Sequence, residues 1–350
     1  PRITHVFNND HRPDLKQLVF GLNVTADGAV PISHEIYSGN RSDDTVHRSN
    51  VDRLRQILGR MDFIYVADSK LSTRKNLAYV AKFGGKFVSV LPRSRAKDQR
   101  LRKALRQGAH ARWRQLLEIE NKRRKNDPPD VYYSTTDGPR ETSEGYRIVW
   151  IRSSQKMEID ALARETSLQK DEAELFDLNA RLNRGKLRKR PSIAKEISKI
   201  LHHHHCMRFL KVRIGYQHLI KTKHLRRGRP RKNAPVKQVR TRVYHLEVRR
   251  DKEALRGEAR TDGVFPLVTN LAPRQTPKKE VLLIYKYQPY VEKRHALFKT
   301  ELEVAPIYLK KPIRAAGLVH AVFLAMTLDA LIERTLRQGM KREDIEALPI

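Results

Sequence analysis

The segment LKQLVFGLNVTADGAVPISHEIY (15–37) decides the fold, because it has the pattern of two strands joined by a turn. Its first part is rich in residues that favour strands, and Ala26-Asp27-Gly28 is a hairpin-type turn. AVPISHEIY then has the pattern of the returning strand. We therefore expect an antiparallel pair of strands here.

Alternating helices and buried strands are predicted next. A short helix is expected over 51–58, and FIYVA (63–67) is a continuous apolar run typical of a strand buried on both faces. Ser72 or Thr73 can cap the following helix, which precedes a second buried strand at FVSVLP (87–92). The order strand-strand-helix-strand-helix-strand predicts an α/β fold with a mixed sheet flanked by helices.

The composition changes after residue 92, and residues 184–232 hold 17 Lys or Arg against one acid, Glu196. The further predicted elements are a basic helical stretch (93–126), strands within 131–152, a helix (158–182), strands in TRVYHLEVRR (241–250) and DGVFPLVTN (262–270), a helix from Thr276-Pro277 and a last helix from Pro312. We expect an α/β core in two parts, 1–92 and 261–350, interrupted by a large basic α+β insertion at 93–260.

The charge of the chain restricts its partners. It carries 72 Lys and Arg against 39 Asp and Glu, a net charge of +33, which points to nucleic acid, an anionic membrane or another polyanion. Cys206 is the single cysteine, so no disulfide can form within the chain. The longest apolar run, 315–330, is interrupted by His320 and Asp329, which favours a buried core helix over a membrane span.

Four side chains near the C-terminus share one helical spacing. Tyr285, Gln288, Glu292 and Lys299 follow one another at steps of three, four and seven residues. At about 100° per residue they fall within about 60° of one another on a single helix. A phenol, an amide, a carboxylate and an amine on one stripe suit a charged ligand. Pro289 lies within the stripe and is expected to kink the helix or to begin it.

Asp68 follows the predicted strand 63–67 directly. Ligands of open α/β sheets bind beyond the carboxyl ends of strands, which favours a functional carboxylate here. A turn or helix-capping aspartate has the same local sequence, and Glu292 and Lys299 taken singly also fit a solvated helix face. Both interpretations stay open from the local sequence.

The chain resembles the DDE transposases of bacterial insertion sequences, which have an RNase H-like fold, in the form whose catalytic core has a long insertion before the last glutamate. The resemblance covers nearly the whole chain. Its most specific parts are HRPDLKQLVFGLNVTADGAVP (11–31), FIYVADSKL (63–71), TDGVFPLVTN (261–270) and YKYQPYVEKRHALFKTELEVAP (285–306). The family's signature is Tyr, two residues, Arg, three residues, Glu, six residues and Lys. Tyr285, Glu292 and Lys299 match it, and Gln288 replaces the arginine.

The resemblance implies metal-dependent cleavage and strand transfer of double-stranded DNA at the ends of an insertion sequence. Asp68 is then the second acid of the triad and Glu292 the third, and together they hold Mg²⁺ or Mn²⁺. Lys299 would pair with a phosphate, and Tyr285 would donate a hydrogen bond or stack on a base. Gln288 cannot give the bidentate phosphate contact of an arginine.

The first acid of the triad is expected on the strand before 15–24, upstream of Pro1, so the chain is expected to lack its N-terminal part. Asp14 is the less favoured substitute. The fragment would then have incomplete catalytic machinery.

Two motifs of the basic insertion remain. Arg227, Arg229 and Arg231 lie in RRGRPRK (226–232), which resembles the core of an AT-hook, although a basic linker that contacts phosphates is the preferred interpretation. His202–His205 precede Cys206, but four consecutive residues of one helix point in four directions, so a surface helix is favoured over a metal site.

Several functions therefore stay open. The first is an active transposase, working as a homodimer in the bacterial cytoplasm on the nucleoid and without a membrane. The second is an inactive DNA-binding remnant of the same fold. Another RNase H-like nuclease and a basic RNA-binding scaffold are weaker alternatives, because neither accounts for the spacing of Tyr285, Glu292 and Lys299.

Overall fold

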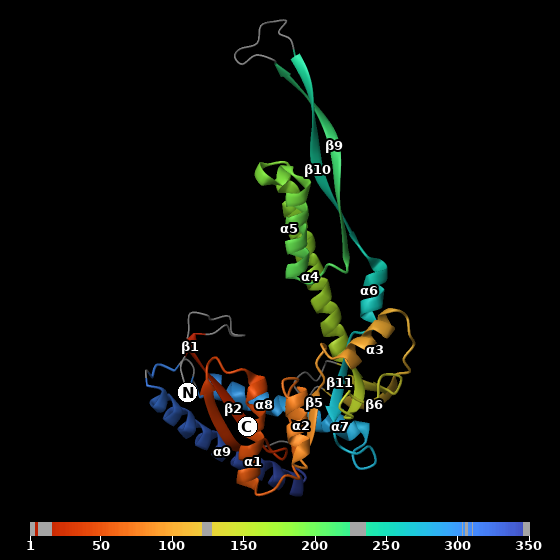
Figure 1. Cartoon of the computed structure of the whole chain (residues 1–350). Coiled ribbons are helices and arrows are strands. Elements are labelled where there is room, and N and C mark those ends of the chain that lie inside the picture. Colours follow the sequence, from red (N-terminus) through yellow and green to blue (C-terminus); the bar gives the residue numbers. More distant parts are fainter. Residues whose placement is uncertain are drawn as a thin grey trace. The chain divides into compact units, whose positions relative to one another are not determined.

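The computed structural model describes residues 4–5, 16–120, 128–224, 236–302, 304, 307–309 and 311–345 (Figure 1). The chain forms two compact units, and each is built from separate stretches of sequence. The first unit comprises Pro1–Asp98, Pro139–Trp150 and Phe265–Ile350, and the second comprises Gln99–Gly138 and Ile151–Val264. The division at residues 92 and 260 stays a prediction.

The fold is mixed α/β, with a mixed six-stranded sheet flanked by helices. The strand order is β4 (Ile64–Val66), β5 (Lys86–Val90), β11 (Val264–Thr269), β8 (Arg147–Ser153), β7 (Asp130–Thr135) and β6 (Arg114–Ile119). β4 and β5 are parallel, whereas β11 pairs with β5, and β6 with β7, in antiparallel register.

The predicted hairpin is confirmed in the first unit. β2 (Lys16–Val24) and β3 (Pro31–Ser38) are antiparallel, and β1 (Thr4–His5) pairs with the other edge of β2. Gly28 and Ala29 have positive φ angles of 115° and 54°, which the turn between the strands requires.

Helices of the first unit cover this hairpin and β5. They are α1 (His47–Leu58), α2 (Arg74–Lys82), α7 (Lys278–Tyr285), α8 (Gln288–Ala296), a π-helical turn (Leu297–Glu301) and α9 (Pro312–Arg342), with a 3₁₀ turn at Asp43–Thr45. The Thr73 side chain caps α2, as predicted, by accepting a hydrogen bond from the Asn76 amide at 3.2 Å.

Only one face of α9 is buried. That face carries Val319, Phe323 and Met326, which lie inside the fold. The same apolar cluster includes Phe298 and the hairpin residues Phe20 and Ile36. By length and composition alone α9 could cross a membrane: an 18-residue window has a mean hydropathy of 1.9, and 28% of it is buried. A buried core helix can have the same length and apolar composition as a membrane span. The contacts of α9 with the hairpin favour a core helix.

The second unit joins two helices to a long two-stranded ribbon (Figure 1). Its elements are α3 (Ala96–Arg106), α4 (Ser154–Arg181), a 3₁₀ turn (Gly185–Arg188), α5 (Arg190–His203), β9 (Leu210–His224), β10 (Val236–Arg250) and α6 (Lys252–Ala259). Leucines and isoleucines of α4 and α5 form its core, together with the part of the ribbon that lies closest to them.

Two asparagines near the end of α4 attach the ribbon. The Asn183 side chain donates to the Tyr244 carbonyl at 2.9 Å and accepts from the Tyr244 amide at 2.7 Å, while Asn179 accepts from the Leu246 amide at 2.7 Å. These bonds satisfy backbone groups on the open edge of β10.

Three expectations from the sequence are wrong. The stretch 93–126 is not a single helix, because α3 ends at Arg106 and β6 follows. β4 is not buried on both faces: Ile64 is 39% exposed, and β4 pairs only with β5 among the described strands. The stripe from Tyr285 to Lys299 is not one helix, because α7 ends at Tyr285 and α8 begins at Gln288. Pro289 in the first turn of α8 accounts for the break, since proline suits a helix start and disrupts a helix interior.

The α4–α5 core gives a matched test of burial on one helix. Leu175 is fully buried and Leu162 is 69% exposed, both on α4. Leu175→Ala should lower the free energy of unfolding by about 2–5 kcal/mol, because it leaves a cavity. Leu162→Ala should change it by less than about 0.5 kcal/mol. Urea unfolding followed by circular dichroism measures both, and equal losses would contradict the assigned core.

Candidate functional site

The backbone of Asp68 is fixed at the carboxyl end of β4. Its carbonyl accepts a hydrogen bond from the hydroxyl of Ser89 at 2.6 Å, and Ser89 is fully buried on β5. A second buried serine, Ser72, donates to the Ser89 hydroxyl at 2.9 Å. The Asp68 side chain accepts from the Lys70 amide at 2.9 Å, and the residue as a whole is exposed. Asp68 is therefore a turn aspartate whose carboxylate keeps acceptor capacity for a ligand.

The charges of Asp68 and Glu292 both influence the phenol of Tyr285. Tyr285 is the last residue of α7, and burial of its ring raises the pKa of the hydroxyl to about 12. The negative charges of Asp68 and Glu292 raise this pKa further. Both carboxylates thus act on one phenol, which keeps its proton at neutral pH.

Glu292 is exposed because its helix is held from the opposite side. Arg294 on α8 is 3% exposed and donates to the Ala29 carbonyl in the hairpin turn at 3.2 Å. It also pairs with Asp329 at 3.0 Å and Glu333 at 2.8 Å, both on α9. Residues two apart on a helix lie about 200° from each other, so the buried Arg294 leaves Glu292 on the outer face.

The hairpin turn holds the same region by a second bond. The Gly28 amide donates to the hydroxyl of Tyr287 at 2.9 Å, directly before α8. Sequence reasoning did not identify Arg294 or Tyr287, because only their partners in a distant turn and on α9 reveal their role.

The remaining members of the stripe occupy other positions. Gln288 is the first residue of α8 and is partly buried. Lys299 lies in the π-helical turn after α8 and is exposed. Its charge, together with burial as the larger cause, lowers the pKa of His295. Tyr285 and Glu292 thus share their surroundings with Asp68 although they lie on two helices.

A basic surface lies on the β9–β10 ribbon of the second unit. Lys221, Lys223, Lys237 and Arg240 are exposed, and among the described residues no acidic group pairs with any of the four. Lys223 and Lys237 stand directly opposite each other in the register. Like charges across a strand pair are destabilising, so this arrangement suits a polyanion that offsets the repulsion. Arg227, Arg229 and Arg231 lie outside the described residues.

No family model, curated protein or solved structure matches this chain. The functional interpretation therefore depends on the residues and their geometry.

The environment of Tyr285 can be tested by titration. Asp68→Asn combined with Glu292→Gln should lower the pKa of Tyr285 from about 12, because both changes remove negative charge that disfavours the phenolate. Glu280→Gln on the same helix α7 is the matched control and should leave this pKa unchanged. NMR of labelled tyrosine, assigned with Tyr285→Phe, measures it. An unchanged pKa in the double variant would separate the two carboxylates from Tyr285.

Proposed function

We propose that the chain is the RNase H-like core of a DDE transposase, which cleaves and joins DNA with divalent metal ions. The observation that carries the proposal is that the charges of Asp68 and Glu292 both raise the pKa of Tyr285, beside the larger effect of burial. The two acids come from positions that match the second and third acids of the family.

The order of elements supports an RNase H-like core. An antiparallel hairpin, a helix, the strand that precedes Asp68, a second helix and a parallel strand follow one another, and the helix with Glu292 comes much later. Residues 151–264 of the second unit lie in sequence between the two acids, as a long insertion would. The second edge of β4 pairs with no described strand, which leaves room for the strand that carries the first acid in the family.

The donor chemistry fits Mg²⁺ or Mn²⁺. Asp68 and Glu292 offer exposed carboxylate oxygens, the hard ligands that these ions prefer. Bound there, the ions would activate the attacking hydroxyl and stabilise the leaving oxygen of a phosphodiester. The bond between the Lys70 amide and Asp68 orients this carboxylate.

Other residues of the chain would bind the DNA backbone. Tyr285 keeps its proton at neutral pH and can donate a hydrogen bond to a phosphate oxygen. Lys299 would supply a positive charge close to α8, and Gln288 a neutral donor. The β9–β10 ribbon would add a sequence-independent contact, since a two-stranded ribbon fits the major groove of DNA.

The ribbon is tested through the salt dependence of DNA binding. Replacing Lys221, Lys223 and Arg240 with Gln should reduce the slope of log affinity against log salt by about 3, because each phosphate contact contributes about 0.9. Replacing Arg55 and Arg60, exposed on or just after α1, is the control with a predicted change near zero. Fluorescence anisotropy of a DNA duplex at several salt concentrations measures the slope. Equal slopes for the wild-type chain and the ribbon variant would exclude the ribbon as a DNA contact.

The catalytic proposal is tested with a longer protein, in which a strand carrying the family's first acid is joined before residue 1. This longer protein should nick supercoiled DNA that carries the element ends, only when Mg²⁺ is present. Asp68→Asn and Glu292→Gln should each lower the rate at least about 100-fold, more than loss of a supporting partner usually costs. Asp62→Asn and Glu301→Gln are exposed controls that should retain it.

Two results would overturn this proposal. Nicking that survives Asp68→Asn would remove Asp68 from the site. Salt-dependent DNA binding without any nicking by the longer protein would support the inactive DNA-binding remnant instead.

A further inference from the structure

The four histidines at 202–205 span the end of a helix. α5 ends at His203, and His204 follows with φ −105° and ψ 11°. His205 then adopts a left-handed backbone with φ 60°. The expectation that the four side chains point in four directions holds only for a continuous helix, so it fails at this helix end.

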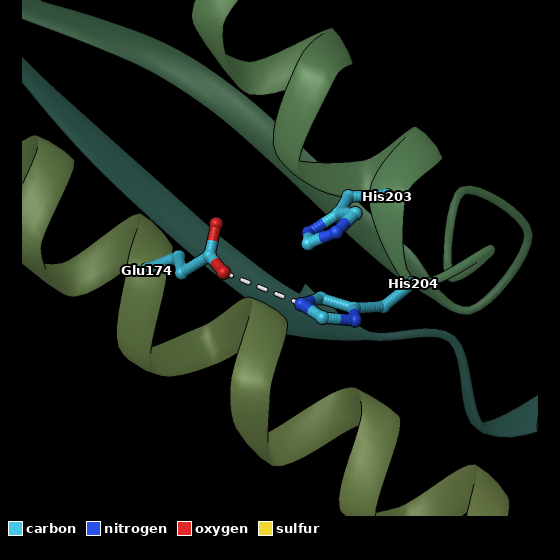
Figure 2. A group of neighbouring side chains, drawn as sticks. All are labelled: Glu174, His203 and His204. Carbon is cyan, nitrogen blue, oxygen red and sulfur yellow. Dashed lines mark hydrogen bonds and ion pairs between the residues drawn. The ribbon is translucent and has the colours of Figure 1, made fainter. Parts of the chain in front are cut away.

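Two of these histidines meet a glutamate of α4. Figure 2 shows Glu174, His203 and His204 facing one another, with Glu174 on one helix and the histidines at the end of another. The Nε2 of His204 lies 3.3 Å from Oε1 of Glu174, and the two imidazole rings are 4.3 Å apart between centroids. One potential ligand atom from each of the three residues lies within 4.8 Å of the others.

A buried carboxylate without a hydrogen bond lies beside this cluster. Asp171, one helical turn before Glu174, is fully buried, and neither of its oxygens accepts a hydrogen bond from the described residues. Its Oδ1 is 3.9 Å from Nε2 of His204. Burying a carboxylate is costly, and its interactions with the Cys206 thiol and with His204 offset only part of that cost. A cation at His204 would offset more of it.

Cys206 supports the cluster without belonging to it. The buried thiol donates to the His204 carbonyl at 3.4 Å. Cys206 is 1% exposed and is not among the residues whose ligand atoms lie within 4.8 Å of one another.

A hollow between α4 and α5 reaches two of the three residues of the cluster, Glu174 and His203. It has a volume of about 330 Å³. Its lining residues are Glu174, Asp177, Leu178, Arg181, Glu196, Lys199, Ile200 and His203. The side chain of Glu174 is 47% exposed, so it can turn towards an ion without unfolding either helix.

We propose that Glu174, His203 and His204 bind a divalent transition metal ion, best matched by Zn²⁺, with the buried Asp171 as its supporting carboxylate. Two imidazoles and a carboxylate are a common zinc ligand set, whereas Mg²⁺ prefers oxygen ligands alone. Tetrahedral bonds of about 2.0–2.1 Å place ligand atoms about 3.4 Å apart, so rotation of exposed side chains closes the site. The bound ion would join the end of α5 to the second half of α4, a few residues before β9 begins.

Metal titration of the full chain, first stripped with a chelator, tests the site. Co²⁺ should give the visible absorption of a low-symmetry site, and Zn²⁺ should displace it. His203→Ala, His204→Ala and Glu174→Gln should each weaken Zn²⁺ binding, measured by calorimetry, by more than about 100-fold. Circular dichroism confirms that each variant is folded.

The neighbouring histidines supply matched controls. His202→Ala and His205→Asn, the latter suited to a left-handed backbone, should leave Zn²⁺ affinity within about threefold of wild type. If these changes cost as much as those at His203 and His204, and Glu174→Gln costs nothing, the metal binds the histidine run adventitiously and the proposed site is overturned.

Asp171→Asn separates metal binding from folding. It should keep or raise the urea midpoint of the metal-free protein, because it removes a buried carboxylate whose desolvation outweighs its interactions with Cys206 and His204. It should also lower Zn²⁺ affinity roughly 10- to 100-fold, as loss of a supporting carboxylate does. An unchanged affinity would overturn the role assigned to Asp171. Neither result depends on DNA cleavage, so this proposal can fail while the transposase proposal stands.

Discussion

The buried guanidinium of Arg294 is the interaction on which the candidate active site depends. It joins three elements that are far apart in sequence: the hairpin turn through Ala29, α8 on which it lies, and α9 through Asp329 and Glu333. Its two acidic partners are partly exposed, so a surface salt-bridge argument would give the pairs little weight. The hydrogen bonds of the buried guanidinium to the Ala29 and Gly28 carbonyls contribute more, because without them these backbone groups of the turn would lose their partner. The orientation of Glu292 follows from the position of Arg294.

Local sequence was sufficient wherever local physics decides the structure. The β2–β3 hairpin, the cap at Thr73 and the break at Pro289 all depend on a few adjacent residues, and the sequence predicted them. The prediction that Tyr285 to Lys299 share one helical stripe was wrong because helical spacing was extended across a proline. Strand β4 was expected to be buried on both faces, because an apolar run does not reveal which of its side chains other elements cover.

The features that could not be predicted from the sequence depend on contacts between segments that are far apart in the chain. Arg294 appears as one basic residue among several in EKRHA, and only the acids of α9 and the hairpin turn show that it is buried. The geometry of the histidine run could not be predicted for a related reason. Its geometry depends on where α5 ends, and helix ends are the least predictable part of a helix. Glu174 lies nearly thirty residues upstream, so no local pattern connects it with His203 and His204.

Charge organises the two units in different ways. In the first unit, the charges of Asp68 and Glu292 both raise the pKa of Tyr285, although the chain as a whole is strongly basic. In the ribbon of the second unit, Lys223 and Lys237 stand opposite each other, and neither pairs with an acid among the described residues. Solvent can offset part of the repulsion between these lysines, and a bound polyanion would offset more of it.

The two candidate metal sites differ in the ligands that they offer. Asp68 and Glu292 present only oxygen, whereas His203 and His204 present nitrogen beside the Glu174 carboxylate. Hard ions such as Mg²⁺ have little affinity for imidazole, whereas Zn²⁺ binds it well. The two proposed sites therefore call for different ions. At the second proposed site a bound ion would also stabilise the fold, because it would offset the cost of the buried Asp171 carboxylate.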